Sequence, residues 1–367
     1  MHVYIHVPFC ARRCSYCDFS IAVRSVTPAN DFVDAILAEW RGALAQPTVA
    51  DATIDTIYFG GGTPSRLPGE SIARVLQQVA ADRQLADDVE ITIEANPDDI
   101  TPELANAWVR AGVNRISLGV QSHDPRVLEW MHRSHRAEQV APAMATIRAA
   151  GMDNISVDLI FGLPESLQRD WEADVVRTIA LQPDHVSMYG LTVEPRTPLA
   201  RWSERGAIEP VGEDRYAAEF LHAHDFLGQA GYEHYEVSNY ARPGRRSRHN
   251  QSYWSGAPYL GLGPSAHSFL DGERWWNIRE WQRYLEASRA GLPLREGSER
   301  LTEEQQAIER VYLGLRTVAG LPEAELPPEL VSGWLGHGWA TLDEGLIRLT
   351  AEGWLRLDAL VSRVAVS

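Results

Sequence analysis

Residues 6–19, HVPFCARRCSYCDF, contain all three cysteines of the chain, Cys10, Cys14 and Cys17, in a C-x3-C-x2-C spacing. An odd number of cysteines, clustered within eight residues, does not form a disulfide framework. Two arginines, a serine and an aspartate lie between and beside them, so this stretch is not part of a packed apolar core. The spacing therefore predicts a metal site.

Two kinds of metal site fit this cysteine loop. Zinc requires four ligands, and His6 could complete a Cys3His set. A [4Fe–4S] cluster also takes four ligands as a rule, so three thiolates leave one iron open to a small chelating molecule. Arg12 and Arg13, between the first two cysteines, would offset part of the thiolate charge.

The composition excludes several other classes of protein. The 367 residues include 34 basic and 50 acidic side chains, a formal net charge of −16, which disfavours nucleic acid as a partner. The sequence has no lysine, which excludes a lysine Schiff base and a P-loop lysine. No apolar run is long enough for a transmembrane helix, and the start lacks the features of a signal peptide. We therefore expect a protein of the reducing cytoplasm.

Strand-like and helix-like segments alternate through the first 190 residues. The expected strands are Val3–Val7, Thr56–Phe59, Val89–Ile93, Arg115–Val120, Ile155–Phe161 and His185–Leu191. The expected helices are Asp31–Leu44, Ser71–Ala81, Pro102–Ala111, Ala137–Ala150 and Leu167–Ala180. This alternation implies parallel β/α units and predicts the α/β class, with a partial (β/α)6, TIM-like barrel.

In such a barrel the chemistry lies at the carboxyl ends of the strands. The residues at those ends are the cysteine loop, Gly61, Gly62, Thr63, Glu94, Gln121 and Asp158. Because these ends meet at one face, we expect the residues to converge there. Each also has an ordinary structural interpretation: the glycines as a tight turn, Glu94 as a helix cap, and the other two as satisfied polar groups of the core.

The remainder of the chain suggests two further parts. Residues 1–205 form the expected barrel core, 206–275 a loop-rich bridging segment rich in Tyr, His, Gly and Arg, and 276–367 a smaller, mainly helical domain. In that last part we expect helices at 277–290 and 303–316. A strand at 345–350 and a helix at 351–363 are similar to a winged helix. DNA binding is not expected there, because basic clusters are missing.

With these motifs in place, the sequence resembles the radical S-adenosylmethionine (SAM) superfamily. The resemblance implies that Cys10, Cys14 and Cys17 hold a [4Fe–4S] cluster and that SAM chelates its open iron. It implies SAM contacts from residues along the strand ends and nearby loops. These are Tyr4, Tyr16, Gly61, Gly62, Thr63, Glu94, Gln121, Arg133 and Asp158. Arg133 could instead be a surface charge.

Within that superfamily the chain resembles the oxygen-independent coproporphyrinogen III oxidase group and its haem chaperone branch. The shared motifs are YIHVPFCARRCSYCDF, GGGTPS, GVQS, VDLIFGLP and HNQSYW. Three features favour the chaperone branch. Phe19 stands where the oxidase has a fourth cysteine, only nine residues precede Cys10, and residues 249–254 match an HNxxYW motif of the chaperones.

The HNxxYW motif makes His249 the candidate haem ligand, with His234 and His267 as rivals. A neutral imidazole suits haem iron, and the arginines just upstream, at 242, 245, 246 and 248, could pair with the propionates. A structural histidine beside a solvated basic loop is the alternative. The resemblance also implies a haem-acceptor protein, respiratory in kind, together with contact to a membrane surface and a homodimer.

Two functions stay open at this point: haem delivery and radical SAM oxidation of coproporphyrinogen III. A third alternative is an iron–sulfur protein with another substrate, because a fold does not fix a function.

Overall fold

The computed structural model describes residues 1–364, and a run of six parallel strands forms its centre. These strands are β1 (His2–Val7), β4 (Ile54–Gly61), β5 (Leu85–Ala95), β6 (Arg115–Gln121), β7 (Ile155–Phe161) and β8 (His185–Gly190). They pair in the order in which they occur along the chain, and every pairing is parallel. The predicted α/β class with a partial barrel is confirmed.

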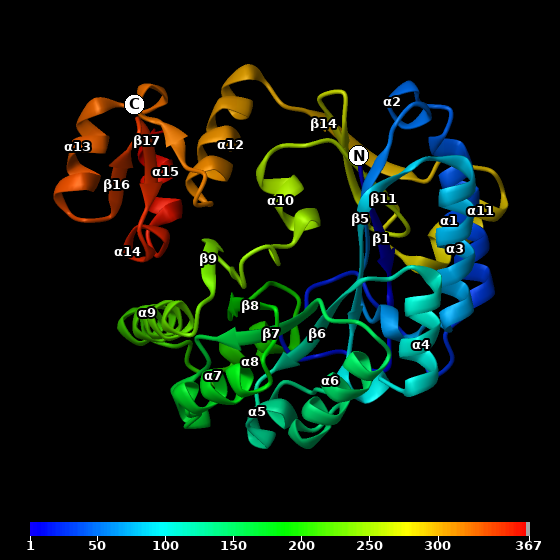
Figure 1. Ribbon diagram of the computed structural model, residues 1–367, viewed down its shortest axis with the longest axis horizontal. Helices are drawn as coiled ribbons and strands as arrows, with labels where there is room; N and C mark the ends of the chain where they lie inside the picture. The colour runs from blue at the N-terminus through cyan, green and yellow to red at the C-terminus, as the bar shows by residue number, and fades with distance from the viewer. Residues whose placement is uncertain (365–367) are drawn as a thin grey trace.

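Helices cover the outer face of these strands (Figure 1). They are α1 (Ala29–Ala43), α3 (Gly69–Asp82), α4 (Pro102–Ala111), α6 (Val140–Ala149) and α7 (Trp171–Ala180). The ends of α4 show how local sequence sets them. Thr101 accepts a hydrogen bond from the Leu104 N–H, Pro102 occupies the first turn, and Gly112 ends the helix at φ +98°.

The sheet continues beyond the barrel strands on both sides, to twelve strands in all within residues 1–364. Beside β1 lie β11 (Tyr259–Leu262), β12 (His267–Leu270), β13 (Glu273–Asn277) and β14 (Arg295–Arg300). Beside β8 lie β10 (Asn239–Ala241) and β9 (Glu233–Glu236). Only β11 among these pairs in parallel, with β1, so the sheet is mixed.

The segment expected to be loop-rich is more regular than predicted, and that expectation is wrong. It contains the long helix α9 (Glu213–Gln229), the strands β9 to β12, and α10 (Arg248–Trp254). Its helix buries Phe220, Ala223 and Leu227, whose spacing gives one apolar face. The Gly- and Tyr-rich composition concealed short strands that are stabilised by pairing with β1 and β8. The domain boundaries at 205 and 275 stay a prediction, since one sheet runs across both.

Three helices begin or break at places that the sequence pattern did not indicate. Helix α7 starts after Asp170, which accepts from the Ala173 N–H, and α11 (Trp281–Arg289) starts after the similar cap Glu280. Residues 351–363 form two helices, α14 (Ala351–Trp354) and α15 (Leu357–Val364), where one was expected.

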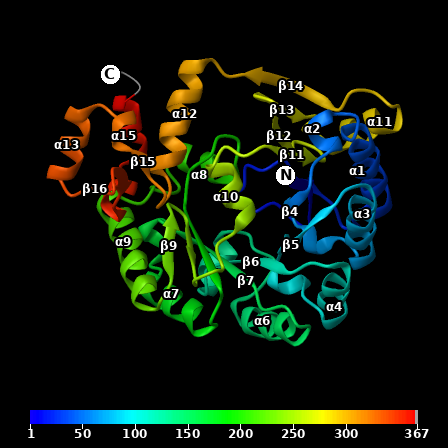
Figure 2. The ribbon, with the colours of Figure 1, turned by 45° about the horizontal axis from the view of Figure 1, so that its top comes forward.

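The carboxyl-terminal part packs beside α9, away from α1 and α3 (Figures 1 and 2). Helix α12 (Glu303–Leu315) leads into a small sheet with the order β15-β17-β16, flanked by α13 to α15. The members not yet given are β15 (Leu321–Pro322), α13 (Pro328–Gly336), β16 (Ala340–Asp343) and β17 (Leu346–Leu349). The ring centroids of Trp354 and His234 lie 4.4 Å apart in an edge-on arrangement, and this contact joins the carboxyl-terminal part to β9.

Short elements complete the fold. They are β2 (Phe9–Cys10), β3 (Ala22–Val23), α2 (Pro47–Ala50), α5 (Pro125–Trp130) and α8 (Pro198–Glu204), with 3-10 turns at 64–66, 97–99, 137–139, 165–167 and 323–325. Across residues 1–364, no helix combines the length and the apolar character needed to span a bilayer.

A buried ion pair joins the carboxyl-terminal part to strand β9 of the large sheet, and its loss should destabilise the protein. Arg316 Nε lies 3.0 Å from Glu236 Oε2, and the two side chains are 15% and 0% exposed. Replacing Arg316 with Ala leaves a buried carboxylate without its cation, so we expect the free energy of unfolding to fall by about 3 kcal/mol. Denaturant unfolding measures this change.

The matched control is Arg310→Ala, which breaks an exposed pair with Glu325. Exposed pairs contribute about 1 kcal/mol or less, so this variant should unfold close to the wild type. Equal losses in the two variants would contradict the role assigned to Arg316.

Candidate functional site

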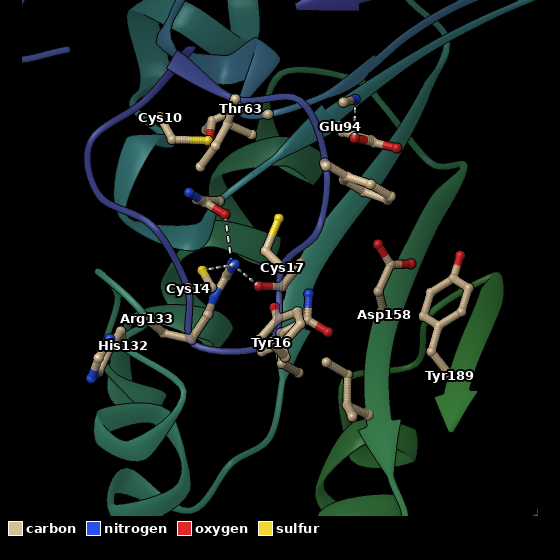
Figure 3. A pocket seen from close by; sticks show the side chains of 18 of the residues that line it. Cys10, Cys14, Tyr16, Cys17, Thr63, Glu94, His132, Arg133, Asp158 and Tyr189 are labelled. Atoms are coloured by element: carbon tan, nitrogen blue, oxygen red, sulfur yellow. Dashed lines mark hydrogen bonds between the residues drawn. The ribbon is translucent and has the colours of Figure 1, made fainter. Parts of the chain in front are cut away.

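The cysteine loop leaves the carboxyl end of β1 and is pinned at several points. Cys10 belongs to β2, whose neighbour is β3, and the Cys10 carbonyl accepts from the Arg24 N–H at 3.0 Å. The Ser15 N–H donates to the Met131 carbonyl at 3.0 Å, which fixes the middle of the loop against the end of α5. The three thiols are free and line one cavity of about 430 Å³ (Figure 3).

Hydrogen-bond donors point at two of the three sulfurs. Thr63 Oγ1 donates to Cys10 Sγ at 3.4 Å, and Arg133 Nη1 donates to Cys14 Sγ at 3.7 Å. Arg133 is itself oriented by Asn96 Oδ1 at 2.6 Å and by the Gly119 carbonyl. Burial raises the pKa of Cys10, and that of Cys17 to about 12. Donors aimed at sulfur favour thiolates, the form that binds metal.

Two carboxylates lie across the cavity from the thiols. Glu94 accepts from Tyr58 Oη at 2.9 Å and from the Gly61 N–H at 3.0 Å. Asp158 accepts from Ser117 Oγ at 2.9 Å. Burial, followed by repulsion from Asp158, raises the pKa of Glu94 to about 7, and burial raises the pKa of Asp158 as well. The cavity therefore offers hydrogen-bond acceptors opposite a sulfur-rich wall.

Gly61 shows why the strand end after β4 is glycine-rich. Its φ of +110° is a left-handed conformation, and a Cβ there would lie 2.5 Å from His6 Cε1. A Cβ on Gly62 would lie 2.8 Å from the Pro8 carbonyl carbon. The glycines thus let β4 end close against β1, and the backbone N–H of Gly61 is already used by Glu94.

A residue of the cavity lining carries an unsatisfied buried atom. Gln121 ends β6 at φ +67°, a strained conformation for a side-chain-bearing residue, and lines the cavity. Its Oε1 is buried without a hydrogen-bond partner in the described part of the chain. Buried polar atoms in native proteins almost always have partners, so this atom indicates that a ligand belongs in the cavity.

Most residues predicted from the sequence do meet here. The cavity is lined by Cys10, Cys14, Tyr16, Cys17, Gly61, Gly62, Thr63, Glu94, Gln121, Arg133 and Asp158. Figure 3 shows the cysteines and Arg133 around one side, with Asp158 and Tyr189 on the other. Tyr4 is absent from the lining. It lies one layer below, with its hydroxyl 3.1 Å from His6 Nδ1 and its ring stacked on Tyr58.

His6 does not complete a zinc site in this structure. Its Nδ1 bonds Tyr4 Oη and its Nε2 lies 3.0 Å from the Ser20 carbonyl, so both ring nitrogens are engaged. Among residues 1–364, no three His, Cys, Asp or Glu side chains are placed to hold a single metal ion. The donor set that remains is three thiols around a shared cavity, which suits a cluster with an open iron better than zinc.

His249, the expected haem ligand, is a buried and hydrogen-bonded residue in this structure. It is 1% exposed, at the amino ends of the strands, with Nδ1 2.6 Å from Thr56 Oγ1 and Nε2 2.9 Å from Tyr253 Oη. Its ring stacks on Tyr58 at 4.9 Å. Both ring nitrogens are therefore engaged in hydrogen bonds, and haem ligation by His249 stays a prediction. Its rival His234 is likewise engaged, by His224 and the Val237 carbonyl.

Several cavity residues were missed by reasoning from the sequence. Asn96 and Ser117 orient Arg133 and Asp158, and Tyr189 lines the far side. Each lies in or just after a barrel strand. For Asn96 and Tyr189, the sequence signal for a place in the cavity was a position at the end of a strand. For Ser117, it was an inward-facing position within a strand.

Comparison with known proteins identifies the family. The model of the radical SAM superfamily matches residues 4–175. The chain is 38% identical over 334 residues to the protein named Heme chaperone HemW of Synechocystis, covering 88% of this chain and 80% of that protein. It is 38% identical over 370 residues to the Heme chaperone HemW of Mycobacterium tuberculosis, covering 98% and 93%. This chain belongs to the HemW family.

A solved structure supports the fold of this HemW-family chain. Coproporphyrinogen III oxidase (HemN) from Escherichia coli, described as a radical SAM enzyme, aligns with a TM-score of 0.81. The alignment covers 98% of this chain and 88% of the oxidase, at 22% identity. At that identity the likeness establishes a shared fold and nothing about the reaction.

Glu94 gives this protein a specific pH dependence. With a folded pKa of about 7, above the ordinary value for glutamate, the folded state holds a proton that the unfolded state has lost. Stability should therefore fall as pH rises from 5.5 to 8, and Glu94→Gln should remove about 1–2 kcal/mol of that fall. Denaturant unfolding of the metal-free protein at the two pH values measures it.

The control is the exposed Glu138→Gln, which should keep the wild-type slope. If Glu94→Gln shows the wild-type pH slope too, Glu94 is not the titrating group.

Proposed function

We propose that this protein is a haem chaperone of the radical SAM type. It holds a [4Fe–4S] cluster on Cys10, Cys14 and Cys17, binds SAM in the adjoining cavity, and passes haem to an acceptor protein in the cytoplasm. The observation that carries the proposal is the convergence of three free thiols, two acceptor carboxylates and the orphaned Gln121 Oε1 on one cavity, in a chain 38% identical to haem chaperones over nearly its whole length.

The cavity residues suit both absent groups. When bound, the cluster supplies an open iron position and a one-electron redox centre. Thr63 and Arg133 donate to thiolate sulfur, which stabilises the ligand form. Glu94 and Asp158 provide acceptors for the ammonium and hydroxyl groups of SAM, and Arg133 provides a cation for its carboxylate. Tyr4 would have an indirect role, because its ring packs against Tyr58, whose hydroxyl donates to Glu94.

Coproporphyrinogen III oxidation is the second candidate, and it has weaker support. The oxidase shares the fold at 22% identity, whereas the chaperone relatives reach 38%. Phe19, in the place of the oxidase's fourth cysteine, is 58% exposed at the mouth of the cavity. A haem-acceptor protein, contact with a membrane surface and a homodimer belong to the proposal as partners.

Anaerobic reconstitution tests the cluster. The wild type should take up about four irons and four sulfides per chain, with a broad charge-transfer band, and Cys14→Ser should lose both because one ligand is gone. Ser15→Ala, in the same loop, is the matched control and should load like the wild type. Bound zinc, or no iron in carefully prepared wild type, would contradict the proposal.

A second experiment separates the two candidate functions. Cluster-loaded protein should bind haem with a saturable Soret band. With SAM, reductant and coproporphyrinogen III, it should form no protoporphyrinogen IX. Formation of that product by chromatography would favour the oxidase instead. Absence of haem binding would overturn the chaperone function.

A further inference from the structure

A second cavity, of about 500 Å³, lies at the opposite end of β1 from the cysteine loop. Its walls come from four segments: His2 at the start of β1, Tyr235 of β9, residues 246–255 around α10 with Arg248 and Trp254, and residues 314–320 from the end of α12 to β15. Figures 1 and 2 both show α10 between the start of β1 and α12. Its volume lies within the range of about 300–1,000 Å³ typical of small-molecule pockets.

The imidazole of His2 has one engaged nitrogen and one free nitrogen. Nδ1 lies 3.0 Å from Thr56 Oγ1, while Nε2 has no hydrogen-bond partner among residues 1–364. Burial lowers the pKa of His2 to about 4, so the ring is neutral near pH 7. A neutral imidazole, oriented through its other nitrogen, is the common form of a histidine ligand to iron.

Thr56 connects this histidine to the HNxxYW motif. Its single hydroxyl proton can go to only one of the two imidazoles, His2 or His249, and it accepts from the other. If His2 Nδ1–H donates to Thr56 and Thr56 donates to His249, then His249 Nε2–H donates to Tyr253. That direction leaves a lone pair on Nε2 of His2, a residue that lines the cavity.

Two arginines of the cavity can bind carboxylates. Arg246 pairs with Glu233 at 3.1 Å and Arg248 with Asp88 at 3.0 Å, and all four side chains are at least one-third exposed. Exposed ion pairs contribute little free energy, so a ligand carboxylate can replace Glu233 or Asp88 with only a small loss of stability. Trp254 also lines the cavity, with the Arg316 guanidinium 4.1 Å from its ring centroid, and Val318 and Ala319 extend the apolar lining.

We propose that this cavity is the haem site, in which His2 Nε2 ligates the iron and Arg246 and Arg248 pair with the two carboxylates. The assignment rests on the proposed function and names the site of its cargo. His249 is then a positioning residue, which orients His2 through Thr56. The cavity combines a neutral imidazole, two arginines whose present carboxylate partners can be replaced, and a tryptophan side chain. This set of groups matches a planar, iron-centred dicarboxylate.

The test compares haem with iron-free protoporphyrin IX on the full chain, tagged at the carboxyl end so that β1 starts unaltered. His2→Ala should weaken haem about tenfold and shift its Soret band, but leave the iron-free porphyrin unchanged, because only iron uses the imidazole. The double variant Arg246→Gln/Arg248→Gln should weaken both ligands about tenfold or more, because both carry the carboxylates.

Matched controls lie outside this cavity. Arg245, next to Arg246, pairs with Asp153 and Asp184, and His337 is exposed at the end of α13. Arg245→Gln and His337→Ala should bind both ligands like the wild type. A filling variant, Ser255→Trp, should block both ligands without removing a cation or the imidazole, and thermal unfolding of each variant checks that it is folded.

The outcomes distinguish an error in the assigned haem site from an error in the proposed chaperone function. If the wild type binds haem and the cavity variants bind it with unchanged affinity and spectrum, the site assignment is wrong and the chaperone function stands. If His249→Ala alone removes the iron ligand signature in folded protein, His249 is the ligand and His2 is not. If the wild type binds no haem, both the function and the site are overturned.

Discussion

Strand β1 is the element on which the rest of the structure depends. It is hydrogen-bonded in parallel to β4 on one side and β11 on the other, and Val3, Ile5 and Val7 are fully buried. A strand paired on both edges and buried has no freedom to slip, because a shift of one residue would reverse its faces. Its carboxyl end therefore delivers the cysteine loop at one fixed place, and its amino end fixes the ring of His2.

Between these two ends the barrel interior is filled with hydrogen-bonding aromatic rings. Tyr58 stacks on both Tyr4 and His249, and its hydroxyl donates to Glu94, which lines the cysteine cavity. Such a packed polar interior is stable only where nearly every group has a partner. One exception in the described residues is Gln121 Oε1, which is buried without a partner in a residue that lines the cysteine cavity, where a ligand can satisfy it.

The sequence predicted the barrel and most of the cavity lining, because both follow from local patterns. Alternating strands and helices place strand ends together whatever the details of packing, so Glu94, Gln121 and Asp158 could be placed beside Cys10 from their positions alone. The regular structure within 206–275 was missed because short strands are specified by their partners, and the partner of β11 is β1, at the start of the chain.

The hydrogen bonds of His249 could not be predicted from the sequence for the same physical reason. Whether an imidazole is free or engaged depends on neighbours such as Thr56 and Tyr253, and the first of these is almost two hundred residues away. A motif shows which side chain is present but not which hydrogen bonds it makes. Tyr4 is a similar case, one layer too deep to touch the cavity it supports.

The pairing of His2 with Tyr259 has a consequence for how the chain is made. While the ribosome is still producing the middle of the protein, one edge of β1 has no neighbouring strand. The loop that carries the three cysteines then follows a strand that is paired on one edge at most. Contacts so distant along the chain form slowly and leave partly folded chains exposed to aggregation. Complete pairing of β1, which fixes the start of the cysteine loop, therefore has to wait until β11, the seventh parallel strand, has been translated.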